Sequence, residues 1–232
     1  MANRKNSVKA LLMRAEKDIG DIEAEYRASL QASEVSDNLK IDIKNFCENL
    51  RSVLDYLAHD IHETHCSRAK PYDRFYFPIL PDRKQFESQT DKWYPDLVKT
   101  KPDLWSYLET VQPYQTGYKW LGQFNKLNNE NKHGNLVEQT RTERNEIRVT
   151  SQGVTQVSWD PKAVKFGNGV YIAGVPVNPS TQLPVSHPSQ KVEKIIWVDF
   201  QFAGIMISAL QLLQQTLAGT RQIAEDIYRL IK

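Results

Sequence analysis

The stretch 38-NLKIDIKNFCENLRSVLDYLAHDIHETHC-66 decides the fold class of this chain. Its apolar residues are spaced alternately four and three positions apart, which draws one stripe along a helix; they are Leu39, Ile43, Phe46, Leu50, Val53 and Leu57. Residues 7–32 repeat this spacing from Val8 to Tyr26. The short polar segment 33-SEVSDN-38 joins the two stripes, with Ser36 or Asp37 as the expected N-cap of the second helix. The pattern predicts an antiparallel helical hairpin.

Three further helices are predicted, over residues 102–112, 116–133 and 203–231, because apolar residues recur there at helical spacing. The pattern breaks between residues 67 and 100. The segment 75-FYFPILPDRKQF-86 contains two prolines and several aromatic residues. We therefore expect it to form a packed loop that crosses the bundle.

The character of the sequence changes near residue 145. Alternating apolar residues from Ile147 to Trp159, around a turn at Gly153, predict a β-hairpin. We expect a second hairpin in 164-VKFGNGVYI-172, a loop over 174–190 and a strand in 195-IIWVDFQF-202. The predicted fold is mainly α (α+β). An antiparallel helical bundle comprises residues 1–144 plus 203–232, and a β-rich insertion, residues 145–202, packs on it before the C-terminal helix.

Composition narrows the function classes. The 232 residues carry a net charge of +2, and 40% are hydrophobic. This balance lacks the strong basic excess that is typical of nucleic-acid-binding domains. The first residues have no apolar core of signal-peptide length, and 203-AGIMISALQLLQQTLAG-219 is too short and too polar for a membrane span. We expect a soluble, cytoplasmic protein that does not bind membranes.

The two cysteines, Cys47 and Cys66, fall in one predicted helix. Their 19-residue separation places them roughly 28 Å apart, beyond the reach of a disulfide. Free thiols agree with a reducing cytosol.

A polar cluster interrupts the apolar face of the helix over 116–133, within 124-FNKLNNENKHGNL-136. On a helical wheel, Asn128 and Asn131 fall among the inward-facing apolar residues. A buried amide without a partner costs about 1–3 kcal/mol. We therefore expect these side chains to find partners inside the bundle.

The helix over 38–66 offers such partners, since Arg51, Asp55, His59 and His62 line the edge of its apolar stripe. If the two helices pack together, these residues converge with the asparagines, Lys132 and His133. Three interpretations remain open. The cluster is a buried structural network, a metal site built from the aspartate and histidines, or an acid–base site that acts on RNA.

Four segments carry a resemblance: 50-LRSVLDYLA-58, 77-FPI-79, 112-QPY-114 and 128-NNENKHGNL-136. They are similar to the RSxLDxLA, FPI, QPY and N-x-(D/N)-KH segments of an uncharacterised family of bacterial proteins. This resemblance spans roughly residues 40–137 and implies no activity.

The chain also resembles, more loosely, the HEPN superfamily of all-α domains. Many of these are dimeric, metal-independent RNases of bacterial stress and phage-defence systems. Asn129 and His133 match the polar residue and histidine of the superfamily motif, whereas Asn128 stands in place of its arginine. The motif is therefore degenerate.

The resemblance implies a protein that binds RNA or cleaves it as an endoribonuclease, using neither a metal nor another cofactor. His133 would act as acid–base group, with Arg51 and Lys132 as phosphate contacts. The positioning residues would be Asn128, Asn129, Asn131, Asp55 and His59. RNA and a second copy of the chain are the implied partners.

Two alternatives stand beside this hypothesis. The chain is a non-enzymatic interaction or scaffolding module, or it is a metal-dependent hydrolase. In the first case the β-rich insertion offers aromatic residues for a protein partner or a base: Trp159, Tyr171, Trp197 and Phe200. The same residues also suit the core of the sheet, which is the interpretation we favour.

Overall fold

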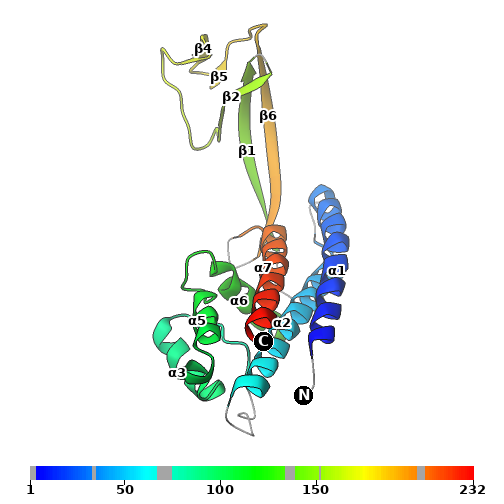
Figure 1. Cartoon of the computed structure of the whole chain (residues 1–232). Helices are drawn as coiled ribbons and strands as arrows, with labels where there is room; N and C mark the ends of the chain where they lie inside the picture. Colours follow the sequence, from blue (N-terminus) through cyan, green and yellow to red (C-terminus); the bar gives the residue numbers. More distant parts are fainter. Residues whose placement is uncertain (1–3, 33–34, 67–74, 134–138, 152, 203–206) are drawn as a thin grey trace. The chain divides into compact units, whose positions relative to one another are not determined.

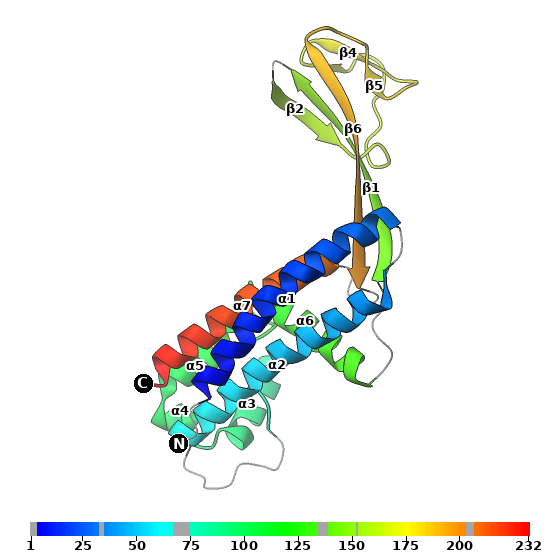
Figure 2. The ribbon, with the colours of Figure 1, turned by 90° about the vertical axis from the view of Figure 1, so that its right-hand side faces the viewer.

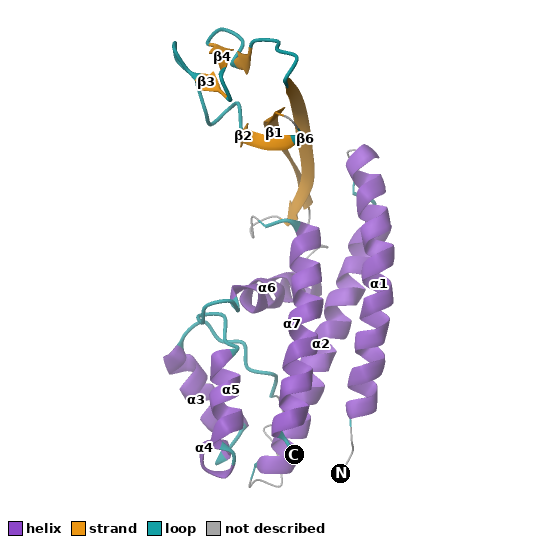
Figure 3. Cartoon of the chain, turned by 45° about the horizontal axis from the view of Figure 1, so that its top comes forward, coloured by secondary structure: helices purple, strands orange, loops and turns teal. Residues whose placement is uncertain are grey.

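A computed structural model describes residues 4–32, 35–66, 75–133, 139–151, 153–202 and 207–232. The chain divides into two compact units: Met1–Thr140 with Gln201–Lys232, and Arg141–Phe200. The first unit contains the described helices and the second contains most of the strands (Figures 1 and 3). The predicted mainly α (α+β) class is confirmed.

Three long helices form the core of the first unit. They are α1 (Lys5–Ala32), α2 (Asp37–His65) and α7 (Ala209–Leu230), and Figure 2 shows them packed along one another. The predicted hairpin of α1 and α2 is confirmed, and the Ser36 side chain accepts a hydrogen bond of 3.0 Å from the Leu39 amide as the N-cap of α2. The apolar stripes meet inside, so that Ala15, Phe46 and Leu213 are each at most 1% exposed.

The buried carboxylate of Asp60 connects residues at one end of the three long helices. Asp60 of α2 accepts hydrogen bonds from the Arg4 guanidinium at 3.1 Å and from the Tyr228 hydroxyl of α7 at 2.9 Å. Only 8% of Asp60 is exposed. Because hydrogen bonds to charged groups are stronger than neutral ones, this contact orders the helix ends.

Four shorter helices complete the bundle: α3 (Arg83–Trp93), α4 (Leu97–Thr100), α5 (Pro102–Thr110) and α6 (Lys119–His133). Residues 75–82 form the expected extended loop, but the expectation of a loop through residue 86 is wrong. Asp82 starts α3 at Arg83, because its side chain accepts a hydrogen bond of 2.8 Å from the Gln85 amide. Helix α3 then buries Phe86 in the core.

The strands form two small sheets. β1 (Gln139–Ser151), β2 (Val154–Trp159) and β6 (Gln190–Phe202) form one sheet in the order β2-β1-β6. The predicted hairpin is confirmed: β1 and β2 pair antiparallel, Ile147 lies opposite Trp159, and Gly153 turns with a φ of 78°.

The second sheet corrects two predictions. It contains β3 (Tyr171–Ile172), β4 (Val175–Asn178) and β5 (Leu183–Pro184), so the expected loop over 174–190 is wrong. Its first hairpin turns at Ala173 and Gly174, whose φ values of 47° and 80° suit a two-residue hairpin turn. The predicted turn at Gly167–Gly169 does not join paired strands.

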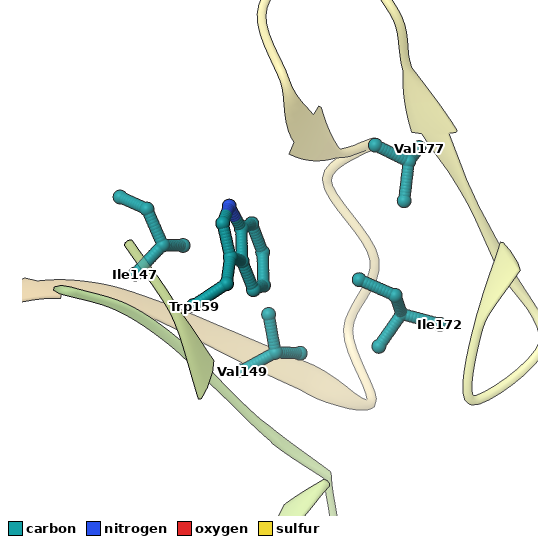
Figure 4. Close-up of a cluster of buried hydrophobic side chains, with 5 residues drawn as sticks. All are labelled: Ile147, Val149, Trp159, Ile172 and Val177. Atoms are coloured by element: carbon teal, nitrogen blue, oxygen red, sulfur yellow. The ribbon is translucent and has the colours of Figure 1, made fainter. Parts of the chain in front are cut away.

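The strand-rich unit has its own apolar core (Figure 4). This cluster consists of Ile147, Val149, Trp159, Ile172 and Val177. The ring centroids of Trp159 and Phe166 lie 5.0 Å apart in an edge-to-face arrangement, and Trp159 is 6% exposed. Trp159 therefore belongs to the core, which is the interpretation favoured above. The favoured core position is wrong for Tyr171, which is 64% exposed, and the side chains of Trp197 and Phe200 lie outside the described part.

Candidate functional site

Arg51 and Asp55 form an ion pair one turn apart on α2. Arg51 Nη2 lies 3.0 Å from Asp55 Oδ1, and Arg51 Nε donates to Asp55 Oδ2 at 3.3 Å. Asp55 Oδ1 also accepts from the Phe77 amide at 3.1 Å, and Arg51 Nη2 donates to the Phe77 carbonyl at 3.4 Å. The pair therefore binds both backbone polar groups of Phe77, as a neighbouring strand would.

Gln112 extends this arrangement from the end of α5. Its amide nitrogen donates to the carbonyl of Pro78 at 3.0 Å and to that of Leu108 at 2.8 Å. Its oxygen accepts from the Leu80 amide at 3.0 Å, and the whole residue is 0% exposed. Because a buried backbone group needs a partner, side chains here replace the missing secondary structure of the loop.

The two sets of contacts bring three of the four resemblance segments together. RSVLD of α2 and QPY at the end of α5 both hold FPI, the loop segment 77–79. We name Arg51, Asp55 and Gln112 the loop clamp. The sequence placed Gln112 at the end of a predicted helix and in the QPY segment but gave it no role at a site, although a glutamine beside a proline at the end of an apolar stripe indicates one.

The asparagines of α6 separate into two groups. Asn128 and Asn131 are buried, at 1% and 6% exposure, which confirms that they face inward, but the expected partner is not found for Asn128 Oδ1 among the described residues. Asn129 is exposed and lies outside this interior group. Asn125, which the sequence did not single out, accepts a hydrogen bond of 3.3 Å from Arg51 Nη1 and is the contact that joins α6 to the loop clamp.

Lys132 and His133 lie in the last turn of α6, and their side chains fall outside the described part of the structure. The predicted convergence of Arg51 with His133 therefore also falls outside it. What the structure places at Arg51 is Asp55, Asn125, the Phe77 carbonyl and the ring of Tyr76, 5.8 Å from the guanidinium carbon.

The histidines of α2 face an aromatic ring. The rings of His59 and His62 lie 4.5 Å and 5.1 Å from that of Phe75. His62 is 4% exposed, and burial together with the neighbouring His59 lowers its pKa. Among the residues that the structure describes, no three His, Cys, Asp or Glu side chains gather as metal ligands do.

The free thiols agree with the sequence expectation. Cys47 is buried within α2 and Cys66 follows its last turn, and neither forms a disulfide. Burial raises the pKa of both thiols, that of Cys66 to about 12. Neither is a reactive thiolate at neutral pH.

Comparison of this chain with protein-family models, curated proteins and solved structures gives no match. None of the described helices is long and apolar enough to cross a lipid bilayer.

Proposed function

We propose that this chain is a non-enzymatic interaction module, in which the helical bundle is the scaffold and the polar cluster of α2 is structural. The observation that supports this proposal is the engagement of Arg51. Its guanidinium contacts Asp55, Asn125 and the Phe77 carbonyl, and the residue is 8% exposed.

A phosphate-binding arginine must present N–H groups to its ligand. The contacts with Asp55, Asn125 and the Phe77 carbonyl use four of the five N–H groups of the Arg51 guanidinium, so a two-point contact with a phosphate would require the loss of at least one of them. The RNA-cleaving hypothesis assigns this residue, with Lys132 and His133, to the reaction. The contacts of Arg51 in the loop clamp are enough to explain its buried position without a role in a reaction.

Stability measurements on Arg51→Gln test the structural role. Removing one partner of a largely buried ion pair costs about 3–5 kcal/mol, and the low end applies here because the Asp55 side chain is 25% exposed. Arg14→Gln is a matched control, since Arg14 pairs with Asp18 at the same helical spacing but is 65% exposed. The control should cost less than about 1 kcal/mol.

RNA cleavage tests the alternative directly. The wild-type chain and His133→Ala are incubated with labelled single-stranded RNA in the presence of EDTA. We expect no cleavage by either protein. Cleavage by the wild type that disappears in His133→Ala would overturn the proposed function.

A further inference from the structure

A groove of about 700 Å³ lies between α1 and α7, which run side by side in the bundle (Figure 2). At one end, the Lys5 ammonium lies over the Tyr228 ring at 5.4 Å. At the other end, Arg221 of α7 forms an ion pair with Glu16 of α1. The two helices therefore run antiparallel, and the groove follows α1 from Lys5 to Glu16.

The floor of the groove is apolar. Val8, Leu12 and Ala224 lie there and are at most 9% exposed. Met13 lines the same groove and is 60% exposed, the highest value for a large hydrophobic residue in the described part of the bundle. Methionine side chains adapt to many shapes, which makes them common at binding surfaces.

The rim of the groove is basic. Two glutamates line it, Glu16 and Glu225, against five basic residues: Lys5, Lys9, Arg221, Arg229 and Lys232. The charged residues that line the groove sum to +3, and Asp226, which pairs with Arg229 beside it, lowers the local charge to +2. Glu16 and Asp226 pair with the two arginines, and Lys9 and Lys232 are exposed to solvent.

We propose that this groove binds an acidic amphipathic helix of a protein partner. The inference rests on the proposed function and names its partner class. The twelve residues from Lys5 to Glu16 extend over roughly 17 Å, which matches about three turns of an incoming helix. Its apolar side chains at positions i, i+3 or i+4, and i+7 contact Met13 and the floor, and its carboxylates meet the lysines.

The shape of the groove selects this partner over an anionic membrane. The buried apolar residues Val8, Leu12 and Ala224 are recessed between two helices, and a flat lipid surface does not reach them. A second copy of the chain is also disfavoured. Its acidic surface between α1 and α2, which includes Asp18, Asp21 and Asp42, is itself hollow, with a volume of about 350 Å³.

Fluorescence anisotropy with the full chain tests the proposal. The probe is a labelled synthetic helix of about 15 residues, with leucines at i, i+3, i+4 and i+7 and glutamates on its flanks. Met13→Glu should weaken binding at least about tenfold, since it places a carboxylate where the groove has its most exposed apolar side chain. Lys9→Glu should weaken binding about threefold or more and reduce its dependence on salt.

Matched controls separate the groove from general effects of charge and hydrophobicity. Ile41→Glu changes a hydrophobic residue of α2 that is 44% exposed, and Lys17→Glu changes an exposed lysine of α1. Neither residue lines the groove. Both variants should bind the probe within about twofold of the wild type.

Four results would overturn the inference. The acidic probe fails to bind, a probe with lysines in place of the glutamates binds equally well, or Met13→Glu binds like the wild type. Binding to vesicles of anionic phospholipid without binding to the probe would also overturn it. RNA cleavage that requires His133 would overturn the proposed function itself. If the probe does not bind and RNA is not cleaved, only the inference about the groove is refuted.

Discussion

Gly219 of α7 lies at the closest described contact between a helical glycine and another helix, and this position yields a quantitative prediction. A Cβ atom added to Gly219 would lie 2.2 Å from Trp120 Cζ2 of α6 and 2.7 Å from two more atoms of the same ring. Carbon atoms in contact are ordinarily about 3.5–4.0 Å apart. Because Trp120 is only 4% exposed, its ring has little room to move away.

The expected free-energy change combines two opposing effects. Alanine is favoured over glycine inside a helix by about 1 kcal/mol. Overpacking of a core costs about 1–3 kcal/mol, and expulsion of a buried tryptophan costs about 3–5 kcal/mol. We therefore expect Gly219→Ala to destabilise the folded state by roughly 1–3 kcal/mol.

Gly20 of α1 provides the matched control. It is also helical, and an added Cβ there would meet no atom within 4 Å. Gly20→Ala should therefore keep the gain in helix propensity and stabilise the protein by about 0.5–1 kcal/mol. Chemical denaturation monitored by circular dichroism should separate the free energies of unfolding of the two variants by roughly 1.5–4 kcal/mol.

A second substitution identifies the cause. If the Trp120 ring opposes the new methyl group, Gly219→Ala should lose most of its cost in a Trp120→Leu background. Equal stability of Gly219→Ala and Gly20→Ala would refute the close contact of α6 and α7. An unchanged cost in the Trp120→Leu background would refute its assignment to the ring.

Three further predictions concern buried polar groups. Gln112→Ala leaves Pro78 and Leu80 without their side-chain partners, so urea denaturation should show a loss of about 2–4 kcal/mol; a loss below about 1 kcal/mol would contradict the loop clamp. Asp60→Ala removes the acceptor of the Tyr228 hydroxyl and the ion-pair partner of Arg4, directly before α1, and should lower the free energy of unfolding by about 2–3 kcal/mol; a Tm unchanged from the wild type would contradict this role. Burial lowers the pKa of His62 in the folded state, so just below pH 6.5 only the unfolded chain protonates this imidazole. The free energy of unfolding should therefore fall as the pH drops below 6.5. A His62→Gln variant with the same pH dependence would show that His62 is not its cause.

Local patterning was enough to predict the helical bundle. The spacing of apolar residues from Leu39 to Leu57 requires a helix whose one side is buried, and the polar turn before Asp37 requires a reversal. Helix α3 escaped prediction because its surface is mostly polar and it buries only Phe86 and Thr90. The second sheet escaped because its strands are two to four residues long and give too short an alternation.

The candidate site shows the limit of such patterning. The inward direction of Asn128 and Asn131 follows from the helical period, and the structure confirms it. The contact of Arg51 with Asn125 does not follow, because it depends on the rotation and offset of α6 against α2. A helical wheel contains neither quantity.

The long helices, the hairpin, the inward asparagines and the position of Arg51 one turn from Asp55 follow from the amino-acid sequence, since each depends on residues within a few turns of one another. What these groups contact follows from tertiary packing. Packing placed the backbone of Phe77 against the ion pair and Gln112 against Pro78, across 22 to 34 positions of chain. It also brought the two ends of the chain together to form the groove of α1 and α7. Contacts between distant segments depend on how whole surfaces fit together, and local periodicity carries no information about that fit.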